Sequence, residues 1–180
     1  MVIALAGRRI DAPDAGTPRF PLASVPLVRD RLAALFEREA ATALVASAAC
    51  GADLVALTVA GARGMRRRVV LPFGRERFRA TSVTDRPGDW GPVYDGILSE
   101  LDPAGAVVTL PGSGEGAEAY RAANEAILGE AAAMARQSGA GVLAVLVWEG
   151  APRGGDDLTA AFGEEARARG LRVVEVTTVA

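Results

Sequence analysis

Three segments place Gly, Ser, Asp or Arg directly after a short apolar run. The clearest is SAACGAD at 47–53, which follows the apolar run 43–46 and leads into a helical pattern. Gly51 would let the backbone approach a ligand closely, and free N–H groups at a helix start favour an anion. Ser47 could bond a phosphate or sugar hydroxyl, and Asp53 suits a ribose hydroxyl. The same side chains could equally cap the helix, so both interpretations stay open.

Two further turns follow the same logic, one after the apolar run 2–6 and one after the run 141–148. The candidate ligand-binding residues in them are Gly7, Arg8, Arg9, Gly154, Gly155 and Thr159. For the second turn, a loop in which Asp156 or Asp157 caps the next helix is the simpler interpretation.

Arginine side chains supply every basic group of the chain, since it contains no Lys. Guanidinium groups pair bidentately with phosphate. Arg19 and Arg79 lie in the two long irregular segments, 7–23 and 73–92, and we expect them to close over the ligand. The triplet at 66–68 is expected to be a solvated turn before a strand, at the opposite edge of the sheet.

Catalytic candidates are few, because the chain has no His and a single Cys. Without His, Cys50 lacks the usual partner of a reactive thiolate, and we interpret it as a small buried residue of the turn. We expect Cys50 to form the floor of the ligand site together with Ser47, Gly51 and Asp53. Carboxylates remain, and the candidates are Asp53, Asp11 and Glu149. We expect no metal site and no cofactor, and the residues alone leave open whether the chain is an enzyme.

The apolar pattern alternates short runs with longer amphipathic segments. Strands are expected at 2–6, 43–46, 68–71, 106–110, 141–148 and 172–177, and helices at 24–41, 51–63, 76–79, 91–101, 117–137 and 156–169. Six strands alternating with helices predict an α/β fold, a Rossmann-like, doubly wound, mainly parallel sheet with helices on both faces. We expect one domain over 1–180.

The composition of the chain narrows the classes of binding partner that we expect. The formal net charge is −2, which gives no general attraction to nucleic acid or to an anionic membrane. Few aromatic residues, not interleaved with basic ones, also argue against single-stranded DNA. No run is apolar and long enough to span a membrane, and one Cys fits a reducing compartment, so we expect a cytoplasmic location.

A family resemblance is carried by several of these segments. The stretch 45–64 resembles the "SGxAxGID…A…G" segment of the SLOG superfamily, with matches at Ser47, Gly51, Asp53 and Gly64. AGRR at 6–9 is similar to the "GSR" that ends the first strand of that superfamily. A less studied bacterial SLOG-like group, of single or signalling-fused domains, is closer. Its marks are IDAP at 10–13, PRFP at 18–21, ACGAD at 49–53, LPF at 71–73, FRATSV at 78–83, YRAAN at 120–124 and VWEG at 147–150.

The resemblance implies a Rossmann-like fold and a site for a nucleotide or nucleotide-derived small molecule, used for sensing. The superfamily also includes the DprA/Smf proteins and the LOG-type phosphoribohydrolases, so hydrolysis of the N-glycosidic bond of a nucleoside monophosphate is the alternative. PGSG at 111–114 only begins the LOG motif PGGxGTxxE, because no Thr follows and Glu118 is out of register. The group's usual Gly-Gly-Thr is interrupted here by Asp156, which disfavours tight phosphate binding. A degenerate domain kept for assembly, with a homodimer through 117–137, also stays open.

Overall fold

One six-stranded parallel sheet organises the chain. The computed structural model describes residues 1–112 and 116–179, and the strand order is β4-β3-β2-β1-β5-β6. The strands are β1 (Val2–Gly7), β2 (Ala43–Ala46), β3 (Arg66–Leu71), β4 (Val107–Thr109), β5 (Val142–Trp148) and β6 (Arg172–Thr177). The predicted α/β, Rossmann-like fold class is confirmed by this order and by the parallel pairing of every neighbouring pair of strands.

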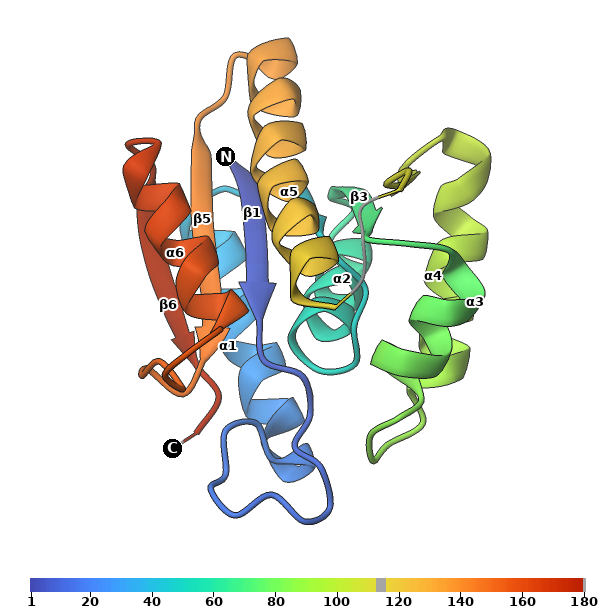
Figure 1. Ribbon diagram of the computed structural model, residues 1–180. Helices are drawn as coiled ribbons and strands as arrows, with labels where there is room; N and C mark the ends of the chain where they lie inside the picture. Colours follow the sequence, from blue (N-terminus) through green and yellow to red (C-terminus); the bar gives the residue numbers. More distant parts are fainter. Residues whose placement is uncertain (113–115, 180) are drawn as a thin grey trace.

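Helices cover both faces of the sheet (Figure 1). They are α1 (Val25–Arg38), α2 (Ala52–Ala62), α3 (Arg75–Phe78), α4 (Trp90–Leu101), α5 (Ala117–Ser138) and α6 (Leu158–Ala168). Single turns of 3₁₀ helix, Leu22–Ser24 and Asp102–Ala104, and a π-helical turn, Arg79–Val83, complete the elements. The helices α1, α2 and α4 pack on one face, and α5 and α6 on the other. None of the helices in the described residues is both long and apolar enough to cross a membrane.

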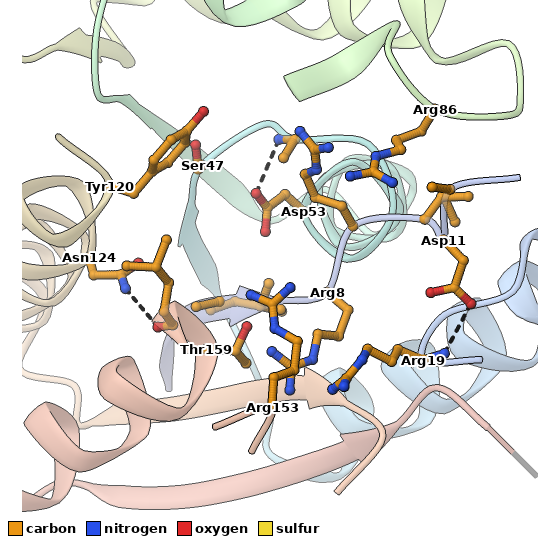
Figure 2. A pocket seen from close by; sticks show the side chains of 18 of the residues that line it. Arg8, Asp11, Arg19, Ser47, Asp53, Arg86, Tyr120, Asn124, Arg153 and Thr159 are labelled. Atoms are coloured by element: carbon orange, nitrogen blue, oxygen red, sulfur yellow. Dashed lines mark hydrogen bonds between the residues drawn. The ribbon is translucent and has the colours of Figure 1, made fainter. Parts of the chain in front are cut away.

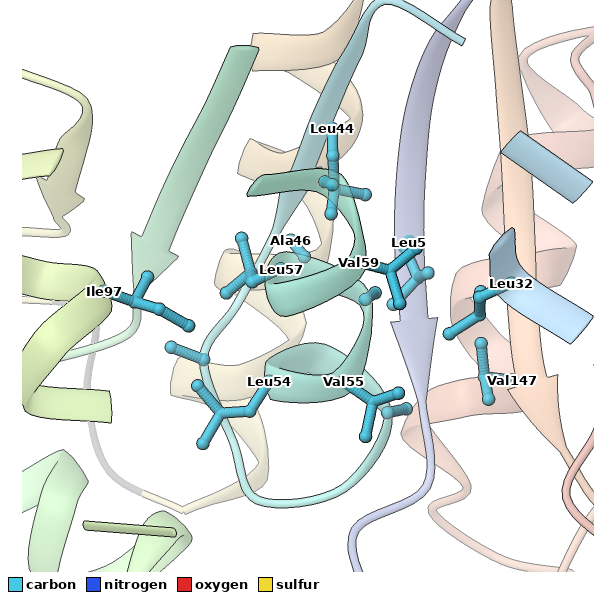
Figure 3. Close-up of a cluster of buried hydrophobic side chains, with 14 of the residues drawn as sticks. Leu5, Leu32, Leu44, Ala46, Leu54, Val55, Leu57, Val59, Ile97 and Val147 are labelled. Atoms are coloured by element: carbon cyan, nitrogen blue, oxygen red, sulfur yellow. The ribbon is translucent and has the colours of Figure 1, made fainter. Parts of the chain in front are cut away.

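Side-chain alternation along β1 shows why both faces need a helical cover. Ile3 and Leu5 belong to the cluster under α1 and α2, whereas Val2 and Ala4 belong to the cluster under α5 and α6. Figure 3 shows the first cluster, with Leu54 of α2 among the labelled side chains. Since successive residues of a strand point to opposite faces, a strand apolar at every position must be buried on both.

The basic triplet at 66–68 is not a solvated turn, and that expectation was wrong. These residues are the first half of β3, and Arg66 pairs in register with Ala43 of β2. The guanidinium of Arg67 donates to Glu100 of α4, and that of Arg68 donates to Glu130 of α5. Carboxylates from both helical layers therefore neutralise two of the strand's three charges, Arg67 and Arg68, which local composition does not reveal.

The neighbouring strands β1 and β5, where the strand order reverses, send the chain in opposite directions. After β1 the chain passes to α1 on one face, and after β5 it passes to α6 on the other face. The loops that follow β1 and β5 therefore diverge at the carboxyl edge of the sheet, which is the lower edge in Figure 1. Ligands of open α/β sheets bind in the crevice that such a divergence leaves.

Candidate functional site

A cavity of about 710 Å³ lies at this divergence. Its walls come from the end of β1 and the loop after it, the start of α2, the first half of α5 and the start of α6. Figure 2 shows side chains from all these segments facing a common space. The volume falls within the range of about 300–1,000 Å³ that is usual for small-molecule sites.

Arg8 is the buried centre of an ion-pair cluster beside the cavity, with 4% of the residue exposed. Its Nη1 and Nη2 donate to the two carboxylate oxygens of Asp157 at 2.6 and 2.8 Å. Its Nε and Nη2 donate to Glu149, and Nη2 also donates to the carbonyl of Ala151 at 3.0 Å. Arg8 lines the cavity, but most of its donors are occupied within the protein. Its main role is to lock the loop after β1 to the loop after β5.

The partners of Arg8 are held as carboxylates. Burial alone would raise the pKa of Asp157, but hydrogen bonds from Arg8 and from backbone N–H groups lower this pKa well below the usual range. Burial would also raise the pKa of Glu149, but hydrogen bonds from Arg8 and Arg19 outweigh this effect and lower that pKa. Glu149 is therefore an ionised, paired carboxylate and is poorly suited to donate a proton.

Asp11, another catalytic candidate, bonds to the backbone of its own loop. Its carboxylate accepts the N–H of Arg19 at 3.0 Å and that of Phe20 at 3.1 Å. These bonds hold the segment between Asp11 and Phe20, which contributes several lining residues to the cavity, Asp11 among them. The carboxylate thus shapes the wall.

Asp53 differs from the other carboxyl groups around the cavity. It lies in the first turn of α2, lines the cavity and is 7% exposed. Burial raises the pKa of Asp53 to about 7, although the N–H of Ala49, donated at 3.1 Å, and the charge of Arg9 lower it. A carboxyl group that titrates near neutrality can hold or release a proton at a ligand. Of the three catalytic candidates, Asp53 has the chemistry best suited to acid–base work.

The backbone at the start of α2 is hydrogen-bonded to the loop after β1, so it does not offer an open anion site. Gly51 has φ +100°, and a Cβ there would lie 2.8 Å from the carbonyl oxygen of Arg8 and 2.8 Å from the nitrogen of Ile10. The N–H of Ala52 donates to that Arg8 carbonyl at 3.0 Å. Gly51 is thus required by close chain packing, and it does not line the cavity. Cys50 is fully buried beside it, and burial raises the pKa of its thiol to about 11.

The other predicted arginines are also paired. Arg9 lines the cavity and donates to the carbonyl of Thr81 at 2.8 Å and to Asp85 at 2.7 Å. Arg19 lines it too and donates to Glu149. Arg79 instead pairs with Asp95 of α4, at 2.9 Å, and does not line the cavity, so the structure does not bring it to this site.

Two arginines that the sequence analysis did not select are the least neutralised cations of the cavity wall. The Nε of Arg86 is buried and makes no hydrogen bond within the described residues, and an Asp85 oxygen lies 3.5 Å from it. The guanidinium of Arg153 contacts Asp157 through its Nε at 3.8 Å, whereas the backbone N–H of Arg153 donates to the same carboxylate at 2.7 Å. Both line the cavity. Their positions in the loop 73–92 and directly before Gly154 were the available sequence signals.

The α5 side of the cavity is apolar and aromatic. The Tyr120 ring packs edge-on against Phe73, with the centroids 5.8 Å apart, and its hydroxyl lies 2.8 Å from the Oγ of Ser82. Asn124 lies one turn further along and donates its Nδ2 to the carbonyl of Leu158 at 2.9 Å. Figure 2 shows Tyr120 and Asn124 on the same wall. The resemblance marked these two residues, but their place in a cavity wall could not be read from spacing alone.

The remaining predicted residues divide between two hollows. Gly7, Ser47 and Thr159 line the cavity, and no hydrogen bond of the Ser47 or Thr159 hydroxyl is found within the described residues. Gly154 and Gly155 line a smaller hollow beside it, of about 160 Å³. Ligand binding by any of these residues stays a prediction. Ser113 and Gly114, which the resemblance to the LOG motif includes, lie outside the described residues.

Metal-ligating side chains do not gather at this site. Among residues 1–112 and 116–179, no group of three or more Asp, Glu, Cys or His side chains is placed to hold a metal ion.

Comparisons with known proteins give one likeness in structure. No protein-family model matches the chain, and no curated protein matches it. The chain is similar to the X-ray structure of DNA processing protein A (DprA) from Streptococcus pneumoniae, with 16% sequence identity and a TM-score of 0.42. The match covers 96% of this chain and 57% of that one. We base no functional argument on a likeness at this level, and membership of the SLOG superfamily stays a prediction.

Proposed function

We propose that the chain binds a nucleotide or nucleotide-derived small molecule in the cavity beyond β1 and β5, and that it serves as a sensing domain. The observation that carries this proposal is the mixed chemistry of the cavity wall. The weakly neutralised guanidinium groups of Arg86 and Arg153 lie in this wall, and α5 contributes an apolar and aromatic surface with one amide. A ligand that joins an anion to a planar ring fits that combination.

The anionic part of the ligand is assigned to Arg86 and Arg153. Their guanidinium groups are only loosely engaged by Asp85 and Asp157, at 3.5 and 3.8 Å. A phosphate offers such a guanidinium two short, charge-assisted hydrogen bonds. Arg8, by contrast, is held by two buried carboxylates and is assigned to the framework.

The sensing role is supported by how the surrounding loops are held. Arg9 and Arg19 come from the loop after β1 and Arg153 from the loop after β5, and each is tied by an ion pair to a carboxylate of the site region. A bound anion would compete for these arginines. Ligand binding would then change how the loops are held without disturbing the buried Arg8 cluster.

A thermal-shift screen tests the proposal. The panel contains nucleoside mono-, di- and triphosphates, cyclic nucleotides and ADP-ribose. A ligand present at 100 times its Kd should stabilise the folded chain by about 2.7 kcal/mol. The proposal is abandoned if no member of the panel at millimolar concentration raises the melting temperature.

Hydrolysis of the N-glycosidic bond of a nucleoside monophosphate is the second candidate. It is favoured by one observation, the buried Asp53 carboxyl with a pKa raised to about 7. In this reading Asp53 supplies acid–base or electrostatic help at the sugar, while the arginines hold the phosphate. Each ligand found in the screen is incubated with the protein and analysed for free base and ribose 5-phosphate. Turnover that Asp53→Asn abolishes, with binding retained, favours the enzyme; binding without turnover favours the sensor.

A further inference from the structure

We infer that Asn124 selects ligands whose ring edge carries an N–H donor, such as the amino group of adenine or cytosine. The inference rests on the proposed function and adds to it the orientation of the ligand. The ring lies on the α5 side of the cavity, and its donor meets the Oδ1 atom of Asn124.

The orientation of the Asn124 amide is fixed by its neighbour. Its Nδ2 donates to the backbone carbonyl of Leu158 at 2.9 Å. A carbonyl oxygen can only accept, so an inverted amide would place two oxygens against each other and lose this bond. Asn124 lines the cavity, and Figure 2 shows its amide at the wall with Nδ2 turned to Leu158. The acceptor Oδ1 and the second N–H of Nδ2 are left for a ligand, and of these only Oδ1 can meet a donor on the ring.

The apolar surroundings of Oδ1 make it discriminate between rings that carry an N–H donor and rings that do not. Ala123, Ile127 and Leu158 line the same part of the cavity and offer no competing polar side chain. When a ring fills this space, Oδ1 loses water, and a ring without a donor leaves it unpaired. A site built to hydrogen-bond a ligand group rejects the analogue that lacks it more strongly than an apolar pocket rejects a missing methylene.

The hydroxyl groups of the cavity distinguish less sharply between a donor and an acceptor on the ring. The hydroxyls of Ser47 and Thr159 rotate and can either donate or accept. The Tyr120 hydroxyl is already paired with Ser82 at 2.8 Å. Asn124 therefore presents the acceptor of fixed direction on this wall.

Sequence context adds an independent reason. Asn124 is the only Asn of the chain, and it stands inside the Ala-rich helix α5. Asn is disfavoured in helix interiors because its side chain competes for backbone hydrogen bonds. Its bond to Leu158 involves only Nδ2 and gives Oδ1 no partner. A ligand donor bound to Oδ1 would leave both ends of the amide paired.

Matched ligand pairs test the inference on the unmodified protein. The Kd of AMP is compared with that of purine ribonucleoside 5′-monophosphate, which lacks only the 6-amino group. CMP is compared in the same way with its analogue that lacks the 4-amino group. For the pair that binds, we expect the amino form to bind about tenfold more tightly.

Two variants locate the effect. In Asn124→Ala the preference should fall to about one, because the acceptor is gone, with folding checked by circular dichroism. In Thr159→Val, on the same side of the cavity, the ratio of the two Kd values should stay as in the parent protein, whatever happens to each value. Equal affinity within a pair that binds, or a preference that survives Asn124→Ala, overturns the inference and leaves the proposed function standing. No binding by any of these nucleotides overturns the inference, and the proposed function falls with it only if the whole panel of the thermal-shift screen also fails to bind.

Discussion

Asp53 and Asp157 are both buried in the same region of the protein, yet their pKa values shift in opposite directions. Burial raises the pKa of Asp53 to about 7, because one N–H and a distant Arg9 offset little of the desolvation. Burial acts on Asp157 too, but Arg8 and three backbone N–H groups outweigh it and lower its pKa. The number of donors around each carboxylate decides its charge at neutral pH.

Replacing Asp53 by Asn should flatten part of the pH dependence of stability. The folded pKa of Asp53 lies above its unfolded value, so its contribution is fully present below about pH 4 and is lost as the pH rises to about 7. Relative to Asp53→Asn, the parent chain should lose up to about 1.4 kcal/mol per pH unit across that window. Urea unfolding at several pH values measures this. A constant difference between the two proteins from pH 4 to 8 would show that Asp53 ionises normally.

Removing the charge of Asp157 should be far more damaging than removing that of its neighbour. Asp157→Asn leaves Arg8 with one carboxylate in a buried place and weakens the cap of α6, so we expect a loss of about 3–5 kcal/mol. Asp156→Asn, the control, removes an exposed pair with Arg121 and should cost less than about 1 kcal/mol. Denaturant midpoints compare the two variants. Similar losses in both would contradict a structural role of the Arg8 cluster.

At the scale of single residues, the sequence predicted which residue types lie at the site better than it predicted their ion-pair partners. Ser47 and Asp53 were placed at the carboxyl edge of the sheet, and both line the cavity. Arg8 was expected to face a ligand, but its partners Glu149 and Asp157 come from a segment about 140 residues away in the chain. A pairing at that separation depends on the strand order, which local spacing does not contain.

The elements meet most tightly where β1 ends beside the start of α2. A Cβ at Gly7 would lie 2.5 Å from the Cβ of Ala52 and 2.6 Å from the carbonyl oxygen of Val147. Only a residue without a side chain allows α2 and β5 to approach β1 so closely. Gly7 therefore serves packing as well as lining the cavity.

Gly7→Ala should destabilise the fold by about 1–3 kcal/mol, since backbone and packed neighbours must move to admit the methyl group. Gly96→Ala is the matched control, because Gly96 is exposed inside α4 and nothing lies within 4 Å of its added Cβ. The control should stabilise by about 0.5–1 kcal/mol through helix propensity. Thermal unfolding gives both values. A neutral Gly7→Ala would show that the three elements are not in close contact.

Element boundaries were predictable where the apolar pattern was clean. The strands at 43–46 and 172–177 have the expected bounds, because each is an apolar or alternating run between turn residues. The prediction for 66–68 was wrong because three charges in a row are typical of a turn. The strand tolerates them because Glu100 and Glu130 lie on the helices that cover it.

At the scale of the whole molecule, the strand order creates the site. Placing β1 and β5 side by side brings residues of the first and last thirds of the chain to one crevice. The sequence predicted that the crevice lies at the carboxyl edge, since this follows from a doubly wound sheet. It did not predict which arginines would stay weakly paired there, because that depends on where every carboxylate falls in three dimensions.

The measurement that tests the central claim most directly is a calorimetric titration of AMP, or of the tightest nucleotide from the screen. It is made on the parent chain and on two double variants that remove the same charge. Arg86→Gln with Arg153→Gln changes the cavity wall, whereas Arg29→Gln with Arg38→Gln changes exposed positions on α1. We predict that the first pair weakens binding at least about tenfold, through lost charge-assisted hydrogen bonds, and that the second pair leaves Kd unchanged. Equal affinity of all three proteins would contradict a ligand anion held by Arg86 and Arg153 in this cavity.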